Sequence, residues 1–223
     1  MRTDLHTVRV PAQPPEPALT ILLVCTGNIC RSALAERLGR AYLDEVLGNQ
    51  ASLIRLVSGG TQAVVDSAMH PHSALVLRGY GAEAGDFRAR QLSDAMAVGA
   101  DLVLTMTRAH RREALRLAPR GLARTFTLRE AADLLRVLGD QQAVGDSFGE
   151  RARTLVGALA DARSRRGSDG LDDVPDPIGG PAEAHEEAAE LIVGSLLPLL
   201  GRFAALVHAD DSLGEGARVA PTH

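Results

Sequence analysis

The sequence predicts an α/β fold, a three-layer sandwich with a central four-stranded parallel sheet flanked by helices. Short apolar segments alternate with segments of helical periodicity along most of the chain. Such an alternation puts right-handed crossover helices on both faces of a parallel sheet. A packed core is expected, because 45% of the residues are hydrophobic and 23% are charged. Since ligands bind at the carboxyl ends of parallel strands, the loops that follow the strands should carry the functional residues.

The first predicted unit is a strand, a loop and a helix. Leu19–Val24 is almost continuously apolar, as expected of a central parallel strand. The loop begins at Cys25, and Ser32 is a candidate N-cap for a helix that reaches about Leu47. Glu36 adds negative charge early in this helix, where the helix dipole favours it.

The remaining elements continue the alternation. Further strands are expected at Leu53–Val57, Asp101–Thr105 and Ala123–Thr127. Helical patterns occupy Pro71–Arg78, Arg108–Leu117, Leu128–Leu138 and Phe148–Arg165, and a last helix has Ala184, Ala188, Leu191 and Ile192 on its inner face. A loop rich in Gly, Asp and Pro, Arg166–Gly180, precedes that last helix. Arg163, Arg165 and Arg166 are expected to form a solvated face.

One domain, 19–207, is expected between an extended N-terminal tail, 1–18, and a C-terminal tail, 208–223. The formal net charge of -4 argues against a nucleic-acid partner. The most apolar stretch, Leu191–Val207, is interrupted by Gly, Pro and Arg, which predicts a buried helix and not a membrane span. The two cysteines are too close in sequence for a disulfide framework, and no signal-peptide pattern is seen, so a cytoplasmic location is expected.

The segment from Cys25 to Ser32 puts a thiol and a guanidinium at opposite ends of a tight loop. Gly27 and Asn28 can take the left-handed backbone conformations that such a turn needs. The loop amides and the following helix N-terminus then form a nest for a tetrahedral oxyanion, without a metal. Arg31 can hold two oxygens of that anion, and the positive charge favours the nucleophilic thiolate of Cys25. Taken singly, the two residues would be a buried cysteine and a surface ion-pair residue.

The run from Leu22-Leu23-Val24-Cys25 to Arg31-Ser32 resembles the phosphate-binding loop of the low-molecular-weight protein tyrosine phosphatase family. Later segments are similar as well: Ser58–Thr61, Arg88–Leu92, Ala100–Met106 and the pair Asp176-Pro177. The similarity covers roughly Leu19–Val207. It implies a hydrolase that acts on phosphomonoesters, above all protein phosphotyrosine, through a cysteinyl-phosphate intermediate and without a cofactor or metal.

The resemblance implies specific roles for residues of this loop. Cys25 is the nucleophile, Arg31 is the phosphate clamp, and Asp176 is the acid that protonates the leaving oxygen and then activates water. The phosphate-binding positions are Thr26, Gly27, Asn28, Ile29, Cys30 and Ser32. Ser58, together with Asn28 and Ser32, should brace the loop by hydrogen bonds.

Two assignments stay open when the residues are considered by themselves. The loop Asp172–Pro181, rich in Gly and Pro, can carry a carboxylate over the phosphate site, and its prolines stiffen the approach. Asp172 and Asp173 rival Asp176 in this role, since Asp before Pro is often only a turn former. The resemblance suggests a protective disulfide between Cys30 and Cys25, and an inert buried cysteine is the alternative.

Ile29 bears on specificity. Related enzymes that act on phosphoarginine carry Thr at this position, whereas an apolar wall favours a phosphotyrosine ring. The sequence departs from the family at Ala33, Phe87 and Thr107, where many members have Pro, His and Asp. Ile178-Gly179-Gly180 replaces the aromatic residues that often follow the acid, which predicts low affinity for phosphotyrosine or a smaller substrate.

Three alternatives accompany this interpretation. A non-catalytic phosphate-binding module would bind vanadate without turnover. An arsenate reductase would need cysteines beyond Cys25 and Cys30, and a phosphoarginine phosphatase is disfavoured by Ile29. The expected partners are a phosphorylated protein or a small phosphomonoester, with no nucleic acid and no membrane, and the protein is expected to be a monomer or weak dimer.

Overall fold

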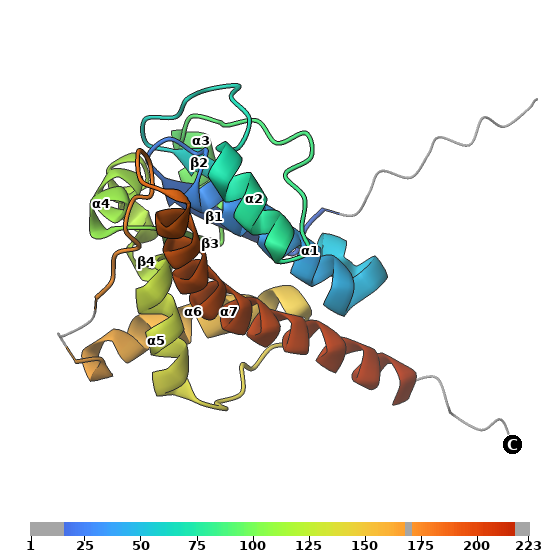
Figure 1. The fold of residues 1–223 in the computed structure, drawn as a ribbon. Coiled ribbons are helices and arrows are strands. Elements are labelled where there is room, and N and C mark those ends of the chain that lie inside the picture. The colour runs from blue at the N-terminus through green and yellow to red at the C-terminus, as the bar shows by residue number, and fades with distance from the viewer. Residues whose placement is uncertain (1–15, 168–170, 217–223) are drawn as a thin grey trace, which may run out of the picture.

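The computed structural model describes residues 16–167 and 171–216. Most of the expected N-terminal tail, and the end of the expected C-terminal tail, lie outside these residues. The described elements form a four-stranded parallel sheet with helices on both faces, as predicted (Figure 1). The strands are β1 (Leu19–Cys25), β2 (Ile54–Gly60), β3 (Leu102–Thr105) and β4 (Thr125–Thr127), in the spatial order β2-β1-β3-β4.

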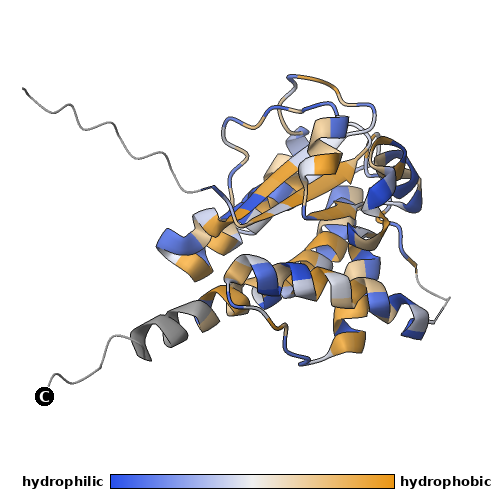
Figure 2. Cartoon of the chain, turned by 180° about the vertical axis from the view of Figure 1, so that it is seen from behind, coloured by the Kyte–Doolittle hydropathy of each residue, from blue (hydrophilic) through white to orange (hydrophobic). Residues whose placement is uncertain are grey.

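β1 lies at the centre of the sheet and pairs in parallel with β2 and β3. Its side chains alternate between two cores, as the period of a strand requires. Leu19, Ile21 and Leu23 face the larger core, and Leu22 and Val24 face the smaller one. Every residue of β1 is buried, which explains its nearly continuous apolar sequence. Figure 2 shows the strands mostly in hydrophobic colours.

The helices divide between the two faces. The larger core is covered by α1 (Arg31–Leu47), α2 (Pro71–Gly79), α5 (Leu128–Leu138), α6 (Phe148–Asp161) and α7 (Ala182–Gly216). The smaller core is covered by α3 (Asp94–Gly99) and α4 (Arg108–Leu117). Short 3-10 helices occupy Gly48–Leu53, Pro119–Arg124 and Ala162–Arg165.

The long helix α7 is the main core helix. It contacts α1, α2, α5 and α6, and Ile192, Leu196, Leu200 and Phe203 are almost fully buried along it. By length and composition, Ala182–Ala209 could also cross a membrane, but half of its most apolar window is buried inside the fold. A core helix of a soluble domain has this same composition, which agrees with the predicted buried helix.

The structure corrects several sequence predictions. Ser32 is not the N-cap of α1, because Cys30 occupies that position and Ser32 lies in the first turn. The short helix α3 was not predicted, and β4 starts at Thr125, since a 3-10 helix precedes it. The last helix runs past the expected boundary at residue 207, to Gly216.

The predicted solvated face of arginines is confirmed for Arg165, which is exposed, and is wrong for Arg163 and Arg166. Arg163 stacks on the Phe126 ring at 4.1 Å from its centroid and donates to Glu130 Oε1 at 2.9 Å. Arg166 is mostly buried and pairs with Asp133 and Asp172. Side chains distant in sequence desolvate these guanidinium groups, which a local charge pattern cannot reveal.

Candidate active site

The loop between β1 and α1 is held from outside by its carbonyl groups. The carbonyl oxygens of Cys25, Thr26, Gly27 and Ile29 accept hydrogen bonds of 2.8–3.0 Å from the backbone N–H groups of Thr61, Gln62, Val64 and His70. Gly60 permits this close approach, because a Cβ there would lie 2.4 Å from the Thr26 carbonyl oxygen. With the carbonyls engaged outside, the amides of the loop are left to bind an anion.

Asn28 is the internal brace of this loop. Its φ of 55° lies in the left-handed region, as the sequence predicted for this position. Its side-chain amide donates to Ser32 Oγ at 2.9 Å and to Ser58 Oγ at 2.8 Å, and its side-chain oxygen accepts from the Arg90 backbone N–H at 2.7 Å. Ser58 in turn donates to Glu36 Oε2 at 2.5 Å. One buried side chain thus ties the loop to β2 and to the segment before α3.

Cys25 lies at the end of β1, under the N-terminus of α1, and is almost fully buried. Its Sγ lies 2.9 Å from Ser32 Oγ and accepts from the Asn28 N–H at 3.3 Å. Hydrogen bonds of this kind and the positive end of a helix stabilise a thiolate. The Ser32 hydroxyl therefore interacts with the Cys25 thiol and does not cap the helix.

Arg31 is 3% exposed, so its charge is almost completely removed from water. It donates to the Val174 carbonyl oxygen at 3.0 Å and to Thr26 Oγ1 at 3.4 Å, and it pairs with Asp176 Oδ2 at 2.5 Å. Its buried Nε–H has no hydrogen-bond partner among the described residues. An anion in the loop can therefore accept from Nε and from the nitrogen that now contacts Asp176, in the bidentate manner typical of arginine.

The three candidate acids have different surroundings. Asp172 is held by Arg108 at 2.9 Å and Arg166 at 2.5 Å, and Asp173 accepts from the Arg108 backbone N–H at 2.7 Å. Both carboxylates anchor the loop to the rest of the fold. Asp176 alone of the three lines the pocket above Cys25. Of the rivals left open by the sequence, only this one is brought to the thiol and the guanidinium.

His110 supports the site, although no sequence motif pointed to it. The imidazole is buried and bridges Thr26 Oγ1 and Thr107 Oγ1, each at 2.9 Å. Desolvation and the nearby charge of Arg31 lower the pKa of His110 from 6.5 to about 4. Its position in the helix that follows the third predicted strand is the signal that could have found it, since that end of the sheet carries the site.

The pocket has a polar floor and an aliphatic rim. Cys25, Thr26, Gly27, Ile29, Cys30, Arg31, Gln62, Val64, Asp176 and Ile178 line it. Val64 and Ile178 are about half exposed and line the pocket from two different loops. The expected phosphate-binding residues Asn28 and Ser32 are buried behind this surface and act through hydrogen bonds. No aromatic side chain is among the lining residues.

Cys30 lies in the same loop, and its side chain is buried. Burial raises the pKa of its thiol to about 11. Both cysteines are free thiols in the structure. The disulfide suggested for Cys25 and Cys30 stays a prediction.

A buried thiol, a clamping guanidinium and a carboxylate around an amide nest, at the carboxyl end of a parallel sheet, define a cysteine-dependent phosphatase. The model of the family described as low molecular weight phosphotyrosine protein phosphatase matches residues 20–140, which is more than half of the chain. The chain belongs to this family. The predicted membership, fold and phosphatase class are thereby confirmed.

Individual relatives agree with this membership. The low-molecular-weight protein-tyrosine-phosphatase of Streptomyces coelicolor is 30% identical over 183 residues, 81% of this chain and 90% of that protein. The crystal structure of the corresponding enzyme from T. tengcongensis is 26% identical with a TM-score of 0.60, covering 82% of this chain and 99% of that one. The arginine phosphatase YwlE of Geobacillus stearothermophilus is 25% identical with a TM-score of 0.56, covering 92% and 99%.

Proposed function

We propose that this phosphatase hydrolyses phosphotyrosine in proteins, with Cys25 as nucleophile, Arg31 as phosphate clamp and Asp176 as general acid. The observation that carries the proposal is that Asp176 is the one of three neighbouring carboxylates that lines the pocket and contacts Arg31. The other two are engaged in holding the loop.

In the first step the Cys25 thiolate attacks phosphorus, an S–P bond forms, and the P–O bond to the tyrosine breaks. The loop amides and the Arg31 guanidinium hold the equatorial oxygens, where charge is spread during the transfer. Entry of the phosphate replaces Asp176 as the partner of Arg31. Released from Arg31, the Asp176 carboxylate takes up a proton from solvent and gives it to the leaving phenolate oxygen.

In the second step the Asp176 carboxylate takes a proton from water, and the resulting hydroxide displaces the Cys25 thiolate from phosphorus. Inorganic phosphate leaves and the thiolate is regenerated. Ser32 stabilises this leaving thiolate, because its hydroxyl lies 2.9 Å from Sγ. Cys25 is therefore the nucleophile of the first step and the leaving group of the second.

The substrate class follows from the walls of the pocket. Ile29, Val64 and Ile178 offer aliphatic contacts to a ring that stands above the loop. A tyrosine side chain is long enough to bring its phosphate down to a buried thiol, whereas phosphoserine is short. The Ile29 side chain also offers no hydrogen-bond partner to the guanidinium group of a phosphoarginine substrate.

The first experiment measures steady-state hydrolysis of para-nitrophenyl phosphate and of phosphotyrosine peptides at mildly acidic to neutral pH. We expect no turnover by Cys25→Ser and a decrease in kcat of about 10²–10⁴-fold in Asp176→Asn. Asp86→Asn is the matched control, because this carboxylate is almost fully exposed and outside the pocket, and its rate should equal the wild type. Vanadate binding without turnover by the wild type would support a phosphate-binding module and refute the enzyme.

The second experiment compares phosphotyrosine and phosphoarginine peptides as substrates of the wild type and of Ile29→Thr. We expect the wild type to prefer phosphotyrosine and the substitution to narrow that preference. A wild type that prefers phosphoarginine would refute the substrate assignment while leaving the phosphatase chemistry intact. The cytoplasmic location, the absence of nucleic-acid and membrane partners, and a monomeric or weakly dimeric state stay predictions.

A further inference from the structure

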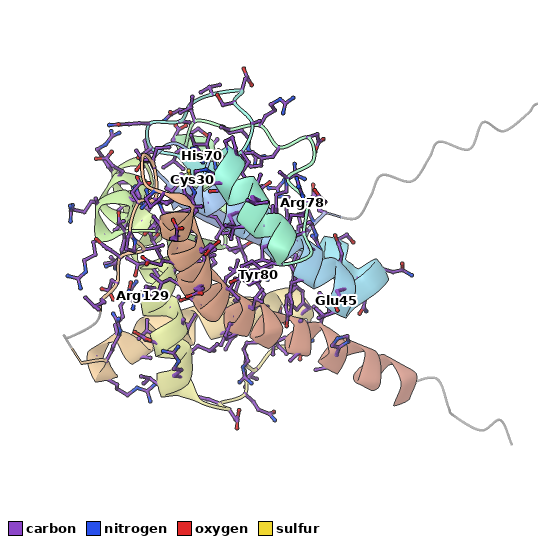
Figure 3. All side chains as sticks on the ribbon, viewed as in Figure 1. Cys30, Glu45, His70, Arg78, Tyr80 and Arg129 are labelled. Atoms are coloured by element: carbon purple, nitrogen blue, oxygen red, sulfur yellow. The ribbon has the colours of Figure 1, made fainter. Side chains whose placement is uncertain are left out.

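A second cluster of functional side chains lies at the N-terminal ends of α2 and α7, beside the catalytic loop. Cys30 Sγ and one ring nitrogen each of His70 and His185 lie within 4.8 Å of one another. The His70 and His185 rings are stacked with centroids 4.6 Å apart, and the His72 ring meets both edge-on at 5.4 and 5.3 Å. Figure 3 shows Cys30 and His70 next to each other, beside the upper end of α2. The phosphatase mechanism uses none of these three histidines.

The ring nitrogens of this cluster are buried and largely unpartnered. His185 is only 1% exposed, and its Nε2 has no hydrogen-bond partner among the described residues. Nδ1 of His70 and Nδ1 of His72 are likewise buried and have no hydrogen-bond partner among the described residues. Buried polar atoms without partners are rare in folded proteins and call for an explanation, such as an ion that binds there.

Ser73 orients one of the candidate ligands. Its Oγ lies 2.8 Å from His185 Nδ1, so an Nδ1–H that donates to Ser73 leaves the Nε2 lone pair unused. This pairing of a ring N–H with an oxygen acceptor is the usual support of a metal-bound histidine.

We propose that Cys30, His70 and His185 form a binding site for one Zn²⁺ ion. A thiolate with two imidazoles is a donor set that suits this borderline ion. Zn–S and Zn–N bonds of about 2.3 and 2.1 Å require the three ligand atoms to approach by roughly 1 Å, which side-chain rotation supplies. On binding, the Cys30 thiol releases its proton to solvent and a Zn–S bond forms, with no change of oxidation state.

The ion would connect the catalytic loop to two helices. Cys30 belongs to the loop, and the His70 backbone N–H donates to the Ile29 carbonyl oxygen at 2.8 Å. A bound ion would therefore hold this side of the loop against α2 and α7. It would also engage the Cys30 thiol, which the predicted disulfide with Cys25 requires.

The experiment is a titration of metal-free protein with Co²⁺, followed by displacement with Zn²⁺, in the absence of any substrate. We expect one Co²⁺ per chain, with the ultraviolet band of a cobalt–thiolate bond, and loss of that band on adding one equivalent of Zn²⁺. Cys30→Ser should abolish the band, and His185→Gln should weaken binding at least tenfold. Cys25→Ser is the matched thiol control and should bind like the wild type.

His70→Gln guards against a folding artefact. This side chain is only partly buried, so the variant should keep its unfolding temperature and still bind Co²⁺ at least tenfold more weakly. A wild type without the band, or a band that survives Cys30→Ser and disappears in Cys25→Ser, would overturn the proposal. Because no turnover is measured, the outcome is independent of whether the chain hydrolyses phosphotyrosine.

Discussion

The buried imidazole of His110 should make the domain sensitive to acid. In the folded protein the pKa of His110 is about 4, because burial and the Arg31 charge disfavour the imidazolium, whereas an unfolded histidine titrates near 6.5. The unfolded chain therefore binds an extra proton between these two pKa values. The stability that neutral His110 contributes is complete above pH 6.5 and is lost as the pH falls toward 4.

The magnitude follows from the two pKa values. Between pH 7 and pH 4.5 this one group lowers the free energy of unfolding by about 2 kcal/mol. Urea denaturation at both pH values measures the total loss, to which carboxyl groups also contribute. The difference between the wild type and His110→Gln isolates the imidazole, and we expect the variant to lose about 2 kcal/mol less.

A second variant tests the cause of the shift. Thr107→Asp puts a carboxylate beside His110 Nδ1, which lies 2.9 Å from Thr107 Oγ1, and should raise the pKa of the imidazole. Titration followed by nuclear magnetic resonance measures the pKa of the His110 ring in the wild type and in Thr107→Asp. A wild-type pKa near 6.5, or equal acid losses in the wild type and His110→Gln, would refute the reasoning.

Three further predictions concern the loop, its anchor and the rim. Gly60→Ala should lower the free energy of unfolding, measured by urea denaturation, by about 1–3 kcal/mol, because the new Cβ would lie 2.4 Å from the Thr26 carbonyl oxygen. Gly99→Ala is the control and should show no such loss, because its Cβ meets no atom within 4 Å. Asp172→Asn removes the charge that two arginines contact and should cost about 1–3 kcal/mol in the same assay, so an unchanged urea midpoint would contradict the anchoring role. Ile178→Tyr adds a ring to the pocket rim and should lower the KM for phosphotyrosine peptides by about two- to tenfold, whereas an unchanged KM would show that the rim does not contact the substrate ring.

Local sequence was sufficient where a function resides in consecutive residues. The loop from Cys25 to Ser32 carries its own nucleophile, clamp and left-handed Asn28, because a strand end, a nest of amides and a helix start need no distant partner to be recognised. α4 and α5 also begin and end where the hydrophobic period predicts, since each covers one face of a core.

Prediction failed where the fold, and not the local pattern, selects the partner of a side chain. The sequence places Ser32 at a helix start, but the fold turns its hydroxyl to the Cys25 thiol. Arg166 looks like part of a charged surface, and only the fold brings it to Asp133, 33 residues earlier in the chain. In both cases the local pattern is compatible with two environments, and burial decides between them.

The sequence by itself determined the class of fold, the phosphate loop and a short set of candidate acids, because these depend on hydrophobic period and on adjacent residues. Only the tertiary structure decided that Asp176 faces Arg31, that His110 supports Thr26, and that Cys30 meets two histidines from separate helix ends. The physical reason is that charge pairing, desolvation and metal ligation depend on distances across the folded chain. Periodicity along the sequence carries no information about those distances.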